Sequence, residues 1–310
     1  MNQYKPEGML ISTTENMELL SSEKGLERAL EKQVILEAPA ILCDQDFNLH
    51  VSLGGRIKGI IPRNEAQYPA SEEVKDIAIL TRVGKPVCFK VTGFTRNSYG
   101  EKTAILSRRS AQEECYRNYI STLIPGDIIP SKITHLESFG AFVDVGCGII
   151  SLLSIDSISV SRISHPSARL SVGDETYSVV KSIDETGRIY VSARELLGSW
   201  EENASLFSEG ETVRGIVRSV EEYGIFVELK PNLAGLAEYK SGVKVGQTAA
   251  VYIKSIIPEK MKIKLIIIDS HDSLPEKETL KYFVDTSYVT HIDRWRYSPE
   301  SSKKIIETVF

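Results

Sequence analysis

The sequence predicts an all-β protein made of three tandem barrels that are joined by short helical connectors. One reason is that short segments of alternating apolar and polar residues are separated by turns containing glycine. Such strands, about five in each stretch of roughly 70 to 80 residues, are typical of small closed barrels that leave no long edge exposed. The other reason is that one strand pattern recurs along the chain, which indicates internal repeats.

The composition is that of an ordinary globular protein, with 42% hydrophobic and 25% charged residues. A length of 310 residues is enough for two or three domains that each have a core. The formal net charge of -5 argues against a protein that coats nucleic acid through bulk charge. It remains compatible with a basic face on one side of a domain.

The four cysteines are isolated from one another, so neither a zinc motif nor a redox motif is predicted. The N-terminus lacks the basic-then-apolar pattern of a signal peptide. No apolar run approaches the ~20 residues that a membrane span requires. We therefore expect a cytoplasmic protein with no cofactor, no metal ion and no membrane partner.

The clearest pattern lies between residues 126 and 146, which we predict to form two strands joined by a tight turn. In the second strand, Ala141 and Val143 share one face and Phe142 lies on the other, because side chains alternate along a strand. The apolar face is expected to meet the core, which leaves Phe142 on the face that meets water. A large aromatic side chain in that place indicates a ligand or a covering surface.

The same pattern returns between residues 210 and 229. Tyr223 and Phe226 match Phe139 and Phe142 at a constant offset of 84 residues (226 − 142). Phe226 also has the same strand parity as Phe142, which chance packing of a core is not expected to reproduce. The two segments are therefore interpreted as copies of one structural unit.

A weaker copy without the aromatic pair lies upstream, and an insert at residues 66–81, expected to be a short helix or a loop, separates its halves. The tail is expected to end in a helix at residues 301–308. The predicted organisation is a lead-in segment with a helix at 1–32, a degenerate barrel at 33–110, a helical connector at 111–124, a barrel at 125–197, a second helical connector at 198–208, a third barrel at 209–269 and a tail at 270–310.

The middle copy carries an ordered series of short motifs. They are Phe-Gly-Ala-Phe-Val-Asp at 139–144, Gly-Ile-Ile-Ser-Leu-Leu at 148–153, Val-Gly-Asp at 172–174 and Ile-Asp-x-x-Gly-Arg-Ile-x-x-Ser at 183–192. This series resembles the S1 RNA-binding domain family, which implies five-stranded OB-type barrels. The succession of repeats and connectors is similar to the bacterial family of ribosomal protein S1. The resemblance implies binding of single-stranded RNA in translation, with the small ribosomal subunit as a candidate partner.

The resemblance also implies a set of RNA-binding residues. In family members of the polynucleotide phosphorylase type, two aromatics, a histidine, an aspartate and an arginine line the RNA face. Four of these positions match Phe139, Phe142, Asp184 and Arg188, whereas Ser154 stands at the histidine position. The loss of the histidine removes one stacking or donor group.

Strand parity leads to an overlapping set without the family. Single-stranded RNA is held by aromatic rings that stack on bases, at about 1–3 kcal/mol per base, and by cations that meet phosphates. Parity and the resemblance together predict these RNA-binding residues, of which Asp184 depends on the resemblance alone: Phe139, Phe142, Lys132, Asp184, Arg188 and Tyr190 in the middle repeat, and Tyr223, Phe226, Arg214, Arg218, Lys262 and Lys264 in the third.

Several of these residues have a structural alternative. Phe142 and Phe226 could be covered by a neighbouring domain or by the tail, and Arg188 could be a structural partner of Asp184. His135 has the parity of the core face and is expected in the interior. We expect Trp200 to anchor its connector to a barrel.

No catalytic motif is found, so we predict a binding protein and not an enzyme. Two alternatives to direct RNA binding in translation stay open. The acidic net charge and the degenerate first repeat favour a protein-docking module. The chain could also be an accessory RNA-binding subunit of an RNA-processing or degradation complex. We expect residues 295–297, Trp-Arg-Tyr, to pack the tail against the third repeat.

Overall fold

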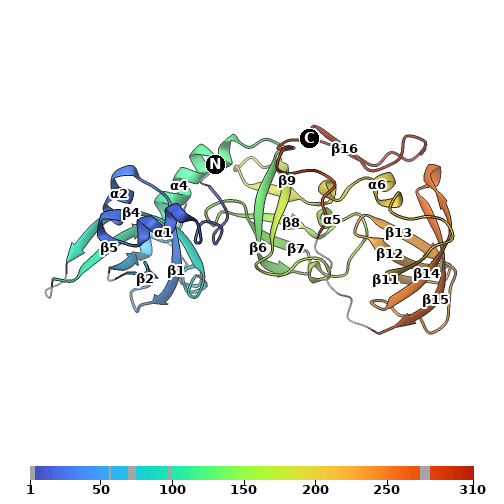
Figure 1. Cartoon of the computed structure of the whole chain (residues 1–310), viewed down its shortest axis with the longest axis horizontal. Helices are drawn as coiled ribbons and strands as arrows, with labels where there is room; N and C mark the ends of the chain where they lie inside the picture. Colours follow the sequence, from blue (N-terminus) through green and yellow to red (C-terminus); the bar gives the residue numbers. More distant parts are fainter. Residues whose placement is uncertain (1–3, 56, 69–74, 97–99, 273–279) are drawn as a thin grey trace. The chain divides into compact units, whose positions relative to one another are not determined.

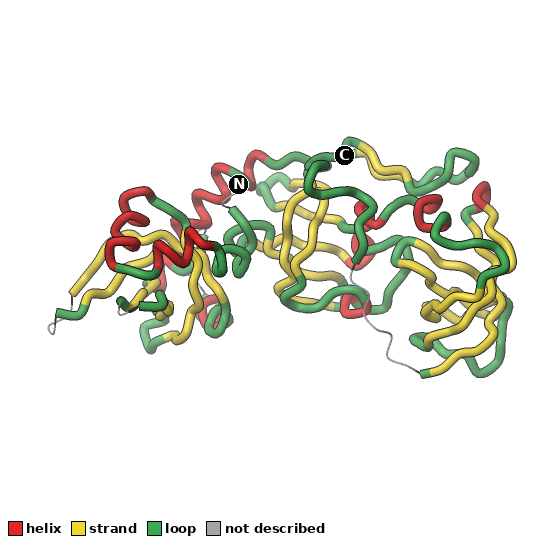
Figure 2. Tube along the Cα trace, viewed as in Figure 1, coloured by secondary structure: helices red, strands yellow, loops and turns green. Residues whose placement is uncertain are grey.

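The computed structural model describes residues 4–55, 57–68, 75–96, 100–272 and 280–310. The strands form three closed five-stranded barrels, which confirms the predicted fold class (Figures 1 and 2). The chain divides into two compact units that are described separately. The first unit holds the residues up to Leu123 together with 130–132 and 144–150, and the second holds the remainder.

The first barrel has the strand order β1-β2-β3-β5-β4. Its strands are β1 (Leu36–Cys43), β2 (Leu49–Ser52), β3 (Lys58–Ile61), β4 (Pro86–Arg96) and β5 (Lys102–Ser107). The parallel pairing of β3 with β5 closes the barrel around a core that includes Phe89 and Leu106. The 3-10 helix η1 (Arg63–Glu65) precedes the insert, which contains α3 (Asp76–Leu80), while residues 69–74 of the insert lie outside the described residues.

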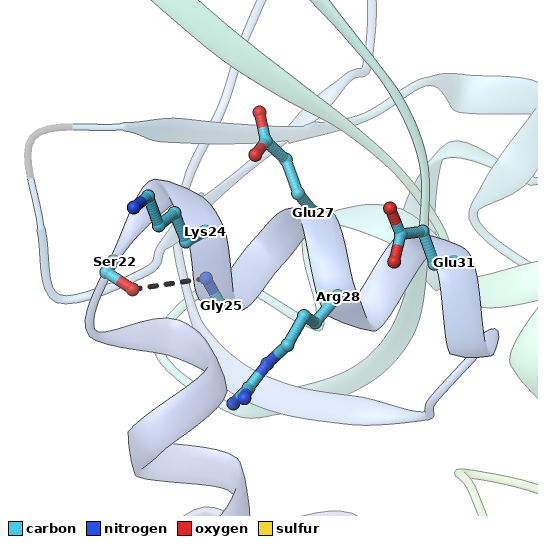
Figure 3. Close-up of a pocket in the computed structure, with 6 residues that line it drawn as sticks. All are labelled: Ser22, Lys24, Gly25, Glu27, Arg28 and Glu31. Atoms are coloured by element: carbon cyan, nitrogen blue, oxygen red, sulfur yellow. Dashed lines mark hydrogen bonds between the residues drawn. The ribbon is translucent and has the colours of Figure 1, made fainter.

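The lead-in segment forms two helices, α1 (Thr14–Leu20) and α2 (Glu23–Lys32). The chain breaks between them because the Ser22 hydroxyl accepts a hydrogen bond from the Gly25 N–H and so begins a new helix (Figure 3). Leu26 and Ala29 of α2 join the core of the first barrel. The outer side of α2, drawn in Figure 3, lines a hollow with side chains of both charges, and Lys102 pairs there with Glu27.

Glu37 of β1 is a buried carboxylate whose oxygens accept hydrogen bonds from the N–H groups of Gly8 and Leu10, at 2.6 and 2.8 Å. Burial raises the pKa of Glu37 to about 7 from 4.5, although these hydrogen bonds oppose the change. Between those values the folded chain binds more protons than the unfolded chain, so stability falls as the pH rises.

We therefore expect the free energy of unfolding of the first unit to decrease from pH 4.5 to pH 7. Urea unfolding at several pH values measures this slope. Glu37→Gln removes one titrating group and should flatten the slope. A stability that increases over the same range would contradict the assignment.

The middle barrel follows the connector α4 (Arg108–Asn118) and the short turn η2 (Ile120–Thr122). Its strand order is β10-β8-β7-β6-β9. The strands are β6 (Ile128–Glu137), β7 (Gly140–Asp144), β8 (Ile150–Ser154), β9 (Glu175–Ile183) and β10 (Ile189–Ser192). Between β8 and β9 the chain forms α5 (Ile155–Ile158) and η3 (Pro166–Ala168).

The third barrel follows η4 (Arg194–Leu197) and α6 (Trp200–Ala204), and its strand order is β11-β12-β13-β15-β14. The strands are β11 (Thr212–Glu221), β12 (Gly224–Lys230), β13 (Leu233–Ala237), β14 (Thr248–Ile257) and β15 (Lys262–His271), with η5 (Pro258–Lys260) before the last. Trp200 packs in the core of this barrel, which confirms its predicted anchoring role.

A glycine begins the second strand of each of these barrels for the same reason. Gly140 and Gly224 have φ values of 159° and 151°. A Cβ on Gly140 would collide with the carbonyl oxygen of Leu153, and one on Gly224 with that of Ala237. The glycine of the repeated motif is therefore required by the close approach of the next strand.

The tail ends in a two-stranded sheet, so the predicted helix at 301–308 is wrong. Strand β16 (Arg294–Arg296) pairs with β17 (Glu307–Val309), and Arg294 forms an ion pair with Glu307. Tertiary contacts override the local helical pattern, because the Thr308 hydroxyl also donates to Glu195 at 3.0 Å.

The tail packs against the third barrel as predicted, because Trp295 and Tyr297 belong to its core cluster. It also contacts the middle barrel, where His291 hydrogen-bonds Asp127 at 2.8 Å. This bond raises the pKa of His291 above 6.5. Within the described residues, no helix is both long and apolar enough to cross a bilayer.

Candidate nucleic-acid interface

In the third barrel, one row of side chains crosses all five strands. The register places Ser219 opposite Phe226, Phe226 opposite Leu236, Leu236 beside Lys264 and Lys264 opposite Ser255. The row lies on the outer face, because the residues that alternate with it along β12 are buried in the core. The barrel therefore presents an aromatic ring and a cation in one line across its surface.

The middle barrel repeats this row with one change. Tyr190 pairs with Leu152 on one side and Ser182 on the other, as Lys264 does with its neighbours in the third barrel. Strand β7 carries Phe142 at the equivalent place. The middle row thus offers a second aromatic side chain where the third row offers an ammonium group.

In each barrel the phenylalanine of the row meets a second ring edge to face. The centroids of Phe139 and Phe142 are 6.0 Å apart with planes at 89°, and those of Tyr223 and Phe226 are 6.2 Å apart at 84°. Phe139 is 53% exposed and Tyr223 is 71% exposed. Edge-to-face contact within each pair is a favoured aromatic geometry, and the outer ring reaches solvent where an unpaired base can stack.

His135 is on the surface, so its predicted interior position is wrong. Its ring stacks beside Phe142 with centroids 6.2 Å apart, and its Nε2 lies 2.8 Å from a Glu137 oxygen. At the matching place in the third barrel, the pairing of β11 with β12 skips one residue between Val217 and Ser219. A bulge of this kind reverses strand parity and turns the next side chain outward. A histidine thus adds a third ring to the middle face.

Asp184 organises the turn between β9 and β10. Its Oδ1 accepts hydrogen bonds from the Thr186 N–H and hydroxyl and from the Arg188 N–H, while its Oδ2 accepts one from the Tyr190 hydroxyl at 3.3 Å. The Thr186 hydroxyl and these other donors lower the pKa of Asp184. Its bond to Arg188 uses the backbone, and the Arg188 side chain is exposed.

The other predicted cationic side chains do not all lie in the cross-strand row. Lys264 lies in the row, and Lys262 is exposed two residues before it on β15. Arg214 is exposed on β11, opposite Ala250 of β14 and five positions before Ser219. Lys132 lies with its ammonium group against Gly8 of the lead-in segment.

Arg218 lies in a buried ion-pair cluster. Its Nε and Nη2 donate to the Glu228 carboxylate at 2.9 and 3.0 Å. Arg169, from the loop between β8 and β9, donates to the same carboxylate through both terminal nitrogens. Glu228 is 4% exposed, so its charge is balanced within the protein.

The sequence prediction missed the loop that carries Arg162. Val160, Ser161 and Arg162 line a surface cavity of about 390 Å³ together with Tyr223 and Phe226. The only local signal for Arg162 was that it is a basic residue in a polar loop between two strands. Its position close to Tyr223 and Phe226 of the next repeat leaves no periodic pattern in the sequence. Two other residues have structural roles: His165 accepts from the Ser167 N–H, and Ser154 donates to the Ser157 hydroxyl.

The sequence is similar to known proteins. Residues 122–194, which span the middle barrel, match the S1 RNA binding domain family. The small ribosomal subunit protein bS1 homolog of Bacillus cereus is 30% identical over 72% of this chain and 56% of its own length. The small ribosomal subunit protein bS1 of Staphylococcus aureus is 28% identical over 74% of this chain and 57% of its own.

The chain thus spans slightly more than half the length of these relatives. A solved structure of a multidomain protein with nucleic acid binding domains from Streptococcus pneumoniae is 16% identical, with a TM-score of 0.24 over 78% of this chain and 76% of that one.

Proposed function

We propose that this protein is a non-catalytic binder of single-stranded RNA that uses the outer faces of its middle and third barrels. The proposal depends on one observation: the two barrels repeat an edge-to-face pair of rings in which the row's phenylalanine is half-buried and the second ring is exposed. Rings stack on any base, so the binding is expected to be tolerant of sequence. The S1 match of the middle barrel supports this reading.

The place of action is inferred from the relatives. Their names refer to the small ribosomal subunit. We therefore propose that the RNA is messenger RNA and that the small ribosomal subunit is the partner in translation. Co-sedimentation of the protein with small subunits, before and after ribonuclease treatment, tests this part independently of RNA affinity.

Replacement of Phe142 by alanine is expected to weaken binding of a labelled single-stranded RNA roughly 5-fold or more, because one stacking platform contributes about 1–3 kcal/mol. Fluorescence anisotropy at fixed salt measures the change. Tyr288→Ala is the matched control, since Tyr288 is an 85% exposed aromatic of the tail outside both rows. If the Phe142 variant and the wild type have equal affinity, the middle barrel does not bind RNA through this face.

Protein docking by the first barrel is a second candidate. The sequence of this barrel lacks the Phe-Gly-x-Phe motif, yet Ile41 and Leu42 of β1 are 60% and 53% exposed. The segment that follows α3 lies beside β1, where the Gly84 N–H donates to the carbonyl oxygen of Ala40. A pull-down that retains partners after ribonuclease treatment, and loses them in Ile41→Ser, would support docking.

A further inference from the structure

The cavity beside Phe226 is built from two barrels. One wall is the outer face of the third barrel and the other is the loop that follows β8 and α5 of the middle barrel. Its volume of about 390 Å³ lies near the lower end of the range of about 300–1,000 Å³ found for small-ligand sites. The lining residues are Val160, Ser161, Arg162, Arg218, Ser219, Glu221, Tyr223, Phe226 and Ala234.

Asn232 holds the loop against the third barrel. It is fully buried, and its Oδ1 accepts a hydrogen bond from the Val160 N–H at 2.9 Å. Its Nδ2 donates to the carbonyl oxygens of Arg194 and Gly198 at 2.8 and 2.9 Å. The neighbouring Pro231 carbonyl accepts from the Ser161 N–H. Because the amide of Asn232 is satisfied on both sides, the loop has a defined position.

The ion-pair cluster around Glu228 supports the same junction. Arg169 reaches it from the middle barrel and Arg218 from the third. Because Glu228 neutralises part of their charge, neither guanidinium is fully available for a ligand. Arg162, in contrast, is exposed and forms no ion pair with another described residue. Arg162 is therefore the available cation of the cavity.

The chemistry of the walls defines the ligand. Phe226 and Tyr223 supply apolar ring surface, which binds the flat face of a base. Arg162 supplies a planar guanidinium that suits a phosphate. The cavity therefore has one wall that suits a base and one group that suits a phosphate. A single unpaired nucleotide contains both.

We propose that this cavity binds a single unpaired nucleotide of the RNA strand, with its base on Phe226 and its phosphate at Arg162. The site needs both barrels, since the arginine comes from the middle one and the rings come from the third. The inference rests on the proposed function of the third barrel. It adds to that function a composite site in which the preceding barrel completes the RNA face.

Glu221 gives the site a base preference. Its carboxylate is part of the same lining and can only accept hydrogen bonds when ionised. Cytosine, adenine and guanine carry an exocyclic amino group that can donate to it, whereas uracil offers only a ring N–H. The nucleotide site therefore favours bases that carry an amino group over uracil.

The first test is the salt dependence of binding to a labelled cytidine 12-mer by the full chain. Arg162→Ala is expected to weaken binding and to lower the slope of log K against log salt by about one, the value for one lost phosphate contact. Because Arg162 is exposed, the substitution should not affect folding. Arg117→Ala, which removes a 70% exposed arginine of α4, is the matched control and should leave the slope unchanged.

Phe226→Ala separates this inference from the proposed function. If Phe226→Ala weakens binding while Arg162→Ala changes neither the affinity nor the slope, the composite site is wrong and the third barrel still binds RNA. If neither Phe226→Ala nor Phe142→Ala weakens binding, both proposals fail. Ultraviolet crosslinking of the bound 12-mer to the peptide that contains residues 160–162 would support the composite site.

The base preference has its own readout. Wild type should bind the cytidine 12-mer more tightly than a uridine 12-mer, and Glu221→Ala should reduce the ratio toward one. Equal affinities for the two oligonucleotides in wild type would overturn the role assigned to Glu221.

Discussion

Replacement of Glu7 by alanine is expected to lower the free energy of unfolding of the first unit by about 3–5 kcal/mol, the cost of leaving a buried charge without its partner. Glu7 is 8% exposed and Arg108 is 4% exposed. Two nitrogens of Arg108 donate to the Glu7 carboxylate at 2.7 and 3.0 Å, and the Cys88 N–H adds a third bond at 3.1 Å. Alanine would remove all three.

The charges around Glu7 decide the size of this effect. Burial raises its pKa, but Arg108 reverses that shift and holds the pKa of Glu7 below 4.5. Asp144 lies close by and accepts from the Glu7 N–H at 2.7 Å, and burial raises its pKa to about 7. Without Glu7, Asp144 would ionise more readily and offset part of the lost attraction to Arg108.

Urea unfolding, with hydrogen exchange of β4 as a local probe, measures the effect of Glu7→Ala. Glu15→Ala is the matched control, because Glu15 is an exposed carboxylate of the same segment. A loss below about 1 kcal/mol, which is the range of exposed ion pairs, would show that the Glu7 cluster does not stabilise the unit.

The double substitution Phe142→Ala and Phe226→Ala is expected to reduce affinity for a long single-stranded RNA by about 30-fold or more. Each ring contributes about 1–3 kcal/mol, and every 1.4 kcal/mol is a factor of ten. Because both faces would bind one strand, loss of both also removes the gain from linked sites. Circular dichroism should remain that of the wild type, since both rings lie on outer faces.

Anisotropy titrations of the single and double variants on one RNA measure this effect. On an RNA long enough for both faces, the double variant should lose more than either single variant. A double variant that matches Phe142→Ala would mean that the third barrel does not contribute. In that case the composite nucleotide site would also lose its basis.

The barrels could be predicted because their signals are local. The parity of Phe142 and Phe226 and the glycine before each strand follow from neighbouring residues. The side of the barrel on which His135 lies could not be predicted, because a bulged residue, such as the one between Val217 and Ser219 at the matching place in the third barrel, reverses the alternation and leaves no mark in the composition. The terminal helix failed because β17 is fixed by residues more than a hundred positions earlier, such as Glu195.

The buried charges were beyond sequence reasoning for a related reason. Glu7 and Arg108 are separated by 101 positions, and neither lies in a pattern that marks a buried residue. The same holds for Glu228, which had the parity of a solvent-facing residue and is covered by Arg169 from another barrel. Long-range pairs of this kind depend on how the repeats pack, which a periodic pattern within one repeat does not encode.

The tail has a practical consequence for shortened versions of the protein. Trp295 and Tyr297 fill part of the core of the third barrel, and the Tyr297 hydroxyl donates to the Asn232 carbonyl at 2.8 Å. A polypeptide truncated at His271, where the last barrel strand ends, would keep every barrel strand but leave this apolar surface uncovered. Such a truncation should aggregate and be digested quickly by proteases, whereas one that retains residues 280–310 should remain soluble.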